Sequence, residues 1–330
     1  MRRILLTSIV AVVLAGGAGF YIRGAAHRND AAAAASEEVD ISPGPKLLVR
    51  STADGAKGHL AVVSAADPGG PRKTSSVTCD RVYAAAGTAI CLRPDGPLAT
   101  YQIAVLGRHL EERDGYPIVG VPNRARVSAD GRLVTWTAFV TGDSYNGGQF
   151  STRVGVLDTA TGDVLADTLE SYALTRDGRP YQAADVNYWG VTFAPAGDRT
   201  FYATLSTAGH RYLVQGDFAT RTVRTLAENV ECPSVSPDGT RIAFKQAVGG
   251  DPARGWRPAV LDLATLRPTV LAETRSVDDQ IAWLDDHTVM YALHRDHAGD
   301  HADVWSLPAD GGGGAATLLV PDAESPAYLR

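Results

Sequence analysis

Hydrophobic and polar positions in this chain follow a short pattern that recurs along most of its length. In its clearest copy, CPSVSPDGTRIAFK at 232–245, two apolar stretches flank the turn sequence Pro-Asp-Gly-Thr. An Asp-Gly pair between alternating apolar residues is typical of two β-strands joined by a tight turn. Related copies stand at 124–137, 190–204, 281–293 and, more loosely, 78–92. The turns of all five copies are about 40–66 residues apart, the spacing of propeller blades. These turns lie at Gly87, Gly131, Gly197, Gly239 and Asp286.

Each copy is followed by a second hairpin, best seen in VGVLDTATGDVLAD at 154–167. One repeat is therefore four short strands, which form one antiparallel blade. Residues 46–76 resemble the last three strands of a further blade, and 321–330 resemble its first strand. Pairing these two segments would close a sixth blade and remove the sheet edges of an open ring. The prediction is an all-β, six-bladed β-propeller of four-stranded antiparallel blades. Its five complete repeats cover roughly 77–120, 121–186, 187–230, 231–276 and 277–320.

The N-terminus differs from the rest of the chain. Arg2 and Arg3 precede an apolar run at 4–22 that is long enough to span a bilayer as a helix. The run also fits a secretory signal peptide, so residues 1–23 are predicted to be a signal anchor or a signal peptide, with the anchor favoured. Residues 24–45 are Ala-rich and lack apolar periodicity, which predicts a flexible linker before a propeller domain at 46–330. The propeller is expected outside the cytoplasm, either as the body of a single-pass membrane protein or as a secreted protein.

The charge of the chain argues against nucleic-acid binding. The net charge is −6, and residues 1–28 contain four Arg and no acidic residue, so the propeller itself is more acidic still. Binding to nucleic acid needs a basic surface that replaces phosphate counterions. The partner is therefore expected to be a protein or a cell-envelope ligand, bound by a monomer.

The sequence S-P-D-G followed by R-I-A-F at 236–244 resembles the repeat of TolB-like propellers, and degenerate copies cover the chain from 46 to 330. The resemblance implies a six-bladed propeller outside the cytoplasm that serves as a protein-binding platform. It is limited to the propeller, because residues 24–45 are too short for the N-terminal α/β domain of TolB. Prolyl-oligopeptidase-type peptidases share the repeat, but they need a G-x-S-x-G motif, and GDSYN at 142–146 lacks its last Gly.

Three cysteines offer a first piece of chemistry. Cys79 and Cys91 lie on either side of a predicted turn, so a disulfide between them is expected in an oxidising compartment, with two buried thiols as the alternative. Cys232 has no evident mate and is expected to be a buried free thiol. The stretch 294–303 is rich in His and Asp, but it is interpreted as a solvated loop. Asp185, Asn187 and Tyr188 are interpreted as turn and strand residues. No cofactor, metal or catalytic residue is predicted.

Long segments at 138–153, 169–188, 245–258 and 294–302 should all project from one face of the ring. Such long connections in a compact domain are often functional. The main hypothesis is a non-enzymatic binding platform that uses this face. The alternative is a propeller enzyme, such as a metal-dependent lactonase or a lyase, with a carboxylate cluster at the channel mouth. The residues predicted to contact a partner are Tyr145, Asn146, Tyr181, Trp256 and Arg257.

Overall fold

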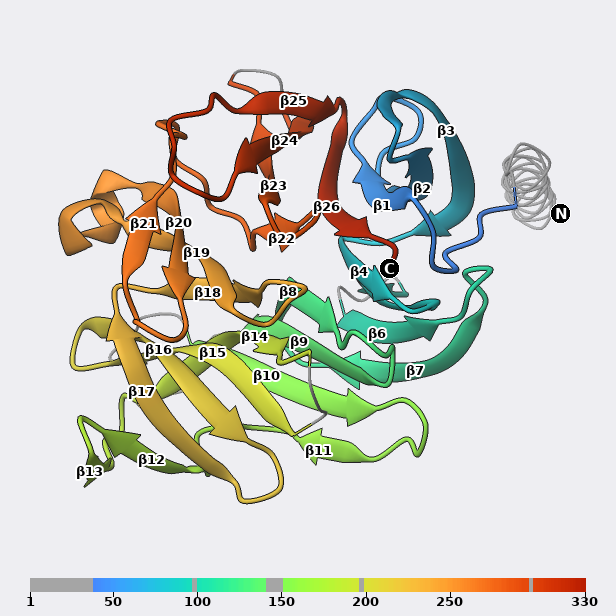
Figure 1. Cartoon of the computed structure of the whole chain (residues 1–330). Helices are drawn as coiled ribbons and strands as arrows, with labels where there is room; N and C mark the ends of the chain where they lie inside the picture. Colours follow the sequence, from blue (N-terminus) through green and yellow to red (C-terminus); the bar gives the residue numbers. More distant parts are fainter. Residues whose placement is uncertain (1–37, 97–99, 141–150, 196–198, 297–298) are drawn as a thin grey trace, which may run out of the picture.

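The computed structural model describes residues 38–96, 100–140, 151–195, 199–296 and 299–330. Six sheets are arranged as blades around a common centre (Figure 1), and all their strand pairs are antiparallel except that of β12 with β17. The predicted six-bladed β-propeller is thus confirmed. Among the described residues no helix is long and apolar enough to cross a membrane, and the predicted N-terminal segment 1–23 lies outside them.

The blades are numbered in chain order, and their strands are given from the channel outward. Blade 1 contains β26 (Ala323–Tyr328), β1 (Lys46–Ser51), β2 (His59–Ser64) and β3 (Asp67–Thr78). Blade 2 contains β4 (Arg81–Ala85), β5 (Thr88–Asp95), β6 (Thr100–Leu106) and β7 (Glu112–Ile118). Blade 3 contains β8 (Val121–Val127), β9 (Leu133–Val140), β10 (Ser151–Asp158) and β11 (Val164–Ala166).

Blade 4 is larger than the other blades. It contains β14 (Asn187–Phe193), β15 (Thr200–Thr207), β16 (His210–Asp217), β17 (Thr222–Glu228), β12 (Ala173–Arg176) and β13 (Arg179–Tyr181). Blade 5 contains β18 (Glu231–Val235), β19 (Arg241–Ala247), β20 (Trp256–Asp262) and β21 (Pro268–Val270), with the 3₁₀ turns η2 (Val248–Gly250) and η3 (Pro252–Arg254) between β19 and β20. Blade 6 contains β22 (Ala282–Trp283), β23 (Thr288–His294), β24 (Ala302–Pro308) and β25 (Thr317–Val320).

The recurring turn sequence forms the hairpin between the first two strands of a blade. In blade 5, the Asp238 carboxylate accepts hydrogen bonds from the Ser236 hydroxyl (2.5 Å) and the Thr240 amide (3.0 Å). Gly239 follows with φ +73°, a conformation that glycine adopts without steric penalty. Blade 3 repeats the arrangement with Asp130 and Gly131, whose φ is +78°. Local side-chain chemistry therefore sets these turns.

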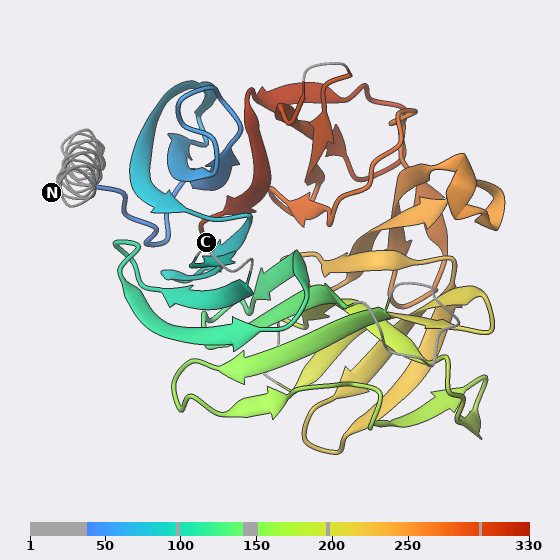
Figure 2. The same cartoon turned by 180° about the vertical axis from the view of Figure 1, so that it is seen from behind.

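The two ends of the propeller meet in blade 1, where β26 pairs antiparallel with β1 in the register Leu47↔Tyr328 (Figure 2). Arg50 of β1 and Glu324 of β26 form a mostly buried ion pair at 2.8 Å. The predicted closure of the sixth blade by 321–330 and 46–51 is confirmed.

Two segments differ from the sequence-based expectations. Blade 4 has six strands rather than four, because the connection that leaves blade 3 folds into the hairpin β12–β13 and adds to β17 in parallel. Tyr172, just before β12, and Leu174 in β12 are buried in the core that blades 3 and 4 share, which explains why the hairpin lies there. Residues 38–45, within the predicted linker, pack on the ring: Val39 and Ile41 are buried, and the Ile41 amide donates to the Arg108 carbonyl at 2.8 Å. The folded domain therefore begins before residue 46.

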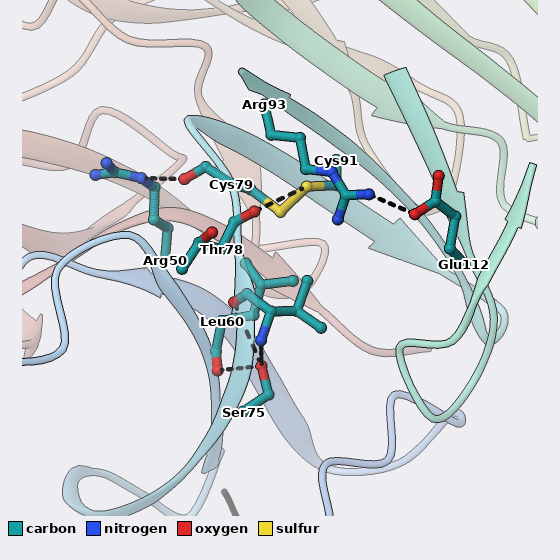
Figure 3. The surroundings of a disulfide bond; sticks show 9 residues. Arg50, Leu60, Ser75, Thr78, Cys79, Cys91, Arg93 and Glu112 are labelled. Atoms are coloured by element: carbon teal, nitrogen blue, oxygen red, sulfur yellow. Dashed lines mark hydrogen bonds and ion pairs between the residues drawn. A yellow bond between two sulfur atoms is a disulfide. The ribbon is translucent and has the colours of Figure 1, made fainter. Parts of the chain in front are cut away.

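A disulfide joins Cys79, which lies between β3 and β4, to Cys91 on β5, with their Cα atoms 5.5 Å apart (Figure 3). Both cysteines are buried, and Arg50 donates to the Cys79 carbonyl at 2.6 Å. Cys232 is free and buried. The predicted pairing is confirmed, and a disulfide of this kind is typical of proteins outside the reducing cytoplasm.

Thiol counting should therefore give one free thiol per chain in protein denatured without reductant. Cys232→Ser should give none, which identifies the free thiol. Reduction, or replacement of Cys79 and Cys91 by Ser, should lower the free energy of unfolding by about 3 kcal/mol, because the bond closes a short loop in the unfolded chain. Three reactive thiols in protein isolated from its native compartment would contradict the pairing.

Candidate functional site at the wide mouth of the channel

The innermost strands run in one direction along the channel. In β8, β14 and β18, the earlier residues line a cavity of about 350 Å³ at one end, and the later residues line one of about 130 Å³ at the other. We call the two ends the wide mouth and the narrow mouth. The connection between β19 and β20 reaches the wide mouth, since Pro252 and Trp256 line its cavity. The wide mouth therefore lies on the face from which the long connections were predicted to project.

A network of charges lines the wide mouth. Lys245 of β19 is buried and lies 3.2 Å from the Glu231 carboxylate of β18. Glu231 also pairs with Arg211 of β16. Asp278, from the segment between β21 and β22, pairs with Lys245 and lies 3.3 Å from Arg124 of β8. Five side chains from five parts of the chain are thus held together by ion pairs.

The two acids of this network differ in their surroundings. Burial raises the pKa of Glu231 above its usual range, against the opposing effect of Lys245 and Arg211. Burial also acts to raise the pKa of Asp278, but the positive charges of Lys245 and Arg124 outweigh it and lower that pKa overall. Although its Oδ1 is held by Lys245 and Arg124, 67% of the Asp278 side chain remains exposed at the mouth. It is the member of the network that an incoming charged group would meet first.

Aromatic side chains complete the wall. The Lys245 ammonium lies 4.3 Å from the centre of the Trp256 ring, and the Arg211 guanidinium lies 5.8 Å from it. Trp256 begins β20 and is half-buried, so part of its ring remains available to a partner. Trp189 of β14 also lines the cavity and is buried. A partly exposed Trp supported by cations suits the recognition of a protein or ligand.

The structure separates the residues predicted as contacts. Trp256 lies at the wide mouth, and Arg257 follows it in β20, with its Nη1 donating to the Trp256 carbonyl at 3.3 Å. Tyr181 lies in β13 at the outer edge of blade 4, and its hydroxyl is 3.0 Å from that of Thr207. Tyr145 and Asn146 lie outside the described residues.

Sequence reasoning missed the charged network. Arg124 comes from the first strand of blade 3, Glu231 from that of blade 5, and Arg211 from the third strand of blade 4, so only the ring brings them together. One signal was present in the sequence. Lys245 directly follows the apolar residues Ile242–Phe244 and is one of the few lysines in the chain. A lysine within a buried strand requires an acidic partner.

The wide mouth does not match the carboxylate cluster expected for the enzymatic alternative. Cations dominate it, and the acids Glu231 and Asp278 are held in ion pairs. Within the described ranges, no group of three or more His, Cys, Asp or Glu side chains is placed to hold a metal ion. In the His- and Asp-rich stretch, Asp303 pairs with Arg295. Asp185 accepts a hydrogen bond from the Thr207 hydroxyl at 2.8 Å.

Comparison with known proteins supports the fold. No protein-family model and no curated protein matches the sequence. Among solved structures, TolB from Acinetobacter baumannii is similar, with 18% identity and a TM-score of 0.61 over 88% of this chain and 68% of that one. A putative TolB from Agrobacterium tumefaciens has 12% identity and a TM-score of 0.52 over 85% of this chain and 90% of that one. A chain of a nidogen/laminin complex has 14% identity and a TM-score of 0.53 over 86% of this chain and 98% of that one. In fold, the chain is a TolB-like six-bladed β-propeller.

Proposed function

We propose that this propeller is a non-enzymatic binding platform outside the cytoplasm, held at the membrane by its N-terminal segment, and that as a monomer it binds a protein or cell-envelope ligand at the wide mouth. The observation that carries the proposal is the half-buried Trp256 stacked on Lys245 above a cavity of about 350 Å³. Such a cavity is large enough for a small ligand or for an anchoring side chain of a partner.

Two further observations support this role. The Cys79–Cys91 disulfide fits a compartment in which disulfides persist. Among the solved structures of similar fold, one is of a nidogen/laminin complex, so a propeller of this architecture is found in a protein assembly. The enzymatic alternative is less well supported, because a carboxylate engaged with Lys245 or Arg124 is not available as a metal ligand or a general base.

Site-specific photo-crosslinking in the native host tests the proposal. A photoreactive residue at Arg254, exposed in η3 beside the wide mouth, should give a crosslinked adduct with the partner. The same residue at His287, exposed in the β22–β23 turn at the other end of the inner strands, should give none. Adducts of equal yield at both positions would contradict a partner site at the wide mouth.

Trp256→Ala should abolish the Arg254 adduct, since an aromatic anchor can contribute 2 kcal/mol or more to an interface. Trp305→Ala is the matched control, because Trp305 is also half-buried and stacked with a cation, Arg275, at 4.0 Å, but lies on β24, outside the wide-mouth lining. Both variants should lower the melting temperature by similar amounts, whereas only Trp256→Ala should lose the adduct. Loss of the adduct in both variants would mean that binding of the partner depends on the stability of the propeller and not on Trp256 itself.

A further inference from the structure

Arg126 is a buried cation without an acidic partner among the described residues. It lies on β8 toward the narrow mouth, and only 6% of the residue is exposed. Its Nη1 donates to the Ala125 carbonyl at 3.2 Å, and its Nη2 donates to the carbonyls of Gln280 (3.1 Å) and Ile281 (2.8 Å). Its Nε has no hydrogen-bond partner in the described part of the chain. The guanidinium is therefore held by carbonyl dipoles, and the described residues give it no ion pair. The charge of Asp279 acts on it from nearby, but Asp279 forms its ion pair with Arg81, at 3.7 Å.

Arg124, two residues earlier on the same strand, shows the contrast. Its Nη2 lies 3.3 Å from the Asp278 carboxylate. Burial lowers the pKa of Arg126, but a guanidinium remains protonated at neutral pH. An unpaired buried charge is strongly unfavourable, and the fold retains it here. An anion that reaches Arg126 would supply the direct ion pair that Asp279 does not provide.

The cavity of the narrow mouth gives access to Arg126. Its volume is about 130 Å³, and the aromatic residues Tyr83, Trp283 and Tyr328 are among those that line it. The Arg126 guanidinium lies 4.3 Å from the centre of the Tyr83 ring. Arg330 adds a second cation at the rim, and no Asp or Glu side chain occurs among the described residues that line this cavity. The site thus combines a buried positive charge, aromatic walls and hydroxyls such as that of Ser234.

A smaller cavity of about 20 Å³ lies next to Arg126 within the channel. Three of its lining residues have a buried polar atom without a partner in the described chain: Arg126 Nε, Gln280 Oε1 and Ser325 Oγ. Its volume suits a single water molecule, which could hydrogen-bond to these atoms. Asp279 also lines this cavity, but its carboxylate pairs with Arg81 and accepts a hydrogen bond from the Ala292 amide at 3.0 Å. A neutral water would satisfy the free hydrogen-bonding atoms without giving Arg126 an ion pair.

We propose that the narrow mouth is a binding site for a small monoanionic carboxylate that carries an apolar or aromatic group. A guanidinium is well matched to a carboxylate. One buried cation balances one negative charge better than the two charges of a phosphate. The aromatic walls offer apolar contact that an inorganic oxyanion cannot use. This site is at the opposite end of the channel from Trp256 and does not depend on the partner proposed for the wide mouth.

Benzoate is a suitable probe, with benzamide as its neutral analogue and inorganic phosphate as an anion without an apolar part. Titration calorimetry on the full chain should show benzoate binding that is at least about tenfold tighter than benzamide binding, the difference expected for a hydrogen bond assisted by charge. Benzoate should also raise the melting temperature in a concentration-dependent way. Equal binding of benzamide, or binding of phosphate but not benzoate, would overturn the proposal.

Arg126→Met should fold, because it replaces an unpaired buried charge with an apolar side chain of similar length, and it should lose benzoate binding by about tenfold or more. Arg330→Ala keeps the buried guanidinium and should weaken binding to a smaller extent. Trp256→Ala should bind benzoate as the wild type does, so failure of the wide-mouth proposal remains distinguishable from failure of this one. Unchanged benzoate affinity in Arg126→Met would overturn the assignment.

Discussion

Deletion of residues 321–330 is expected to unfold the whole propeller rather than one blade. The deleted segment contains β26, the innermost strand of blade 1. Its removal exposes the edge of β1 and removes Ala327 and Leu329, both fully buried. It also leaves Arg50 without Glu324. Together these losses should exceed about 5 kcal/mol, which is comparable to the whole stability of many domains. Circular dichroism should show loss of the cooperative thermal transition near the wild-type temperature.

A circular permutant provides the matched control. Residues 321–330 are moved to the N-terminus and joined by a short Gly-rich linker to residue 46, which makes β26 and β1 a covalent hairpin in their native register. The permutant keeps the same strands with a different chain connection, so its melting temperature should be close to that of a reference that begins at residue 46 and ends at 330. If the truncated protein melts like its parent, or if the permutant fails as badly as the truncation, closure through β26 does not hold the ring together.

The fold could be predicted because its main signal is local. Ser236, Asp238 and Gly239 form a hydrogen-bonded turn from residues within one short segment, and a second copy at 128–131 has the same geometry. Because such a turn depends only on its own residues, it produces a similar short sequence pattern wherever it recurs. Closure then followed from the strand pattern left over at the two chain ends.

The additions to the ring could not be predicted in the same way. The hairpin β12–β13 joins β17 because Tyr172 and Leu174 are buried in the core that blades 3 and 4 share, which is a tertiary preference without a local signal. Residues 38–45 carried a weak signal, the alternation of Val39, Asp40 and Ile41, which was outweighed by the Ala-rich composition before it. The burial of two apolar residues such as Val39 and Ile41 can be predicted only when the surface on which they pack is known.

The candidate sites needed the three-dimensional ring. Trp256 was predicted as a contact because it falls in the long segment 245–258, although it begins the strand β20. Arg124 and Arg126 stand two residues apart on one strand of the repeat unit 124–137. Nothing in the sequence shows that Arg124 pairs with Asp278, whereas Arg126 forms no ion pair in the part of the chain that the structure describes. Pairing across a channel depends on blade number and register, and these are properties of the closed ring.

Lys245→Met is expected to lower the free energy of unfolding by about 3–5 kcal/mol, because it leaves the buried Glu231 short of one of its two cations. Lys57→Met is the control: the ion pair of Lys57 with Asp300 is exposed, and its loss should change stability by about 0.5 kcal/mol or less. Urea denaturation measures both changes. A loss in Lys245→Met no larger than that in Lys57→Met would contradict the view that the network at the wide mouth is held by buried charge pairing.

The double variant Lys245→Met/Glu231→Gln separates pairing from simple loss of a side chain. Removing both charges takes away the uncompensated carboxylate, so the double variant should recover much of the stability that Lys245→Met loses, with a coupling energy of about 1–3 kcal/mol in the thermodynamic cycle. Full additivity of the two single changes would exclude direct coupling. The double variant also bears on function, because it should keep the ring folded while removing Lys245, the nearer of the two cations at the Trp256 ring. If the network serves recognition as well as stability, this folded variant should lose the crosslinked adduct at Arg254; if the adduct persists, the charges at the wide mouth support the fold alone, and recognition is carried by the exposed part of the Trp256 ring.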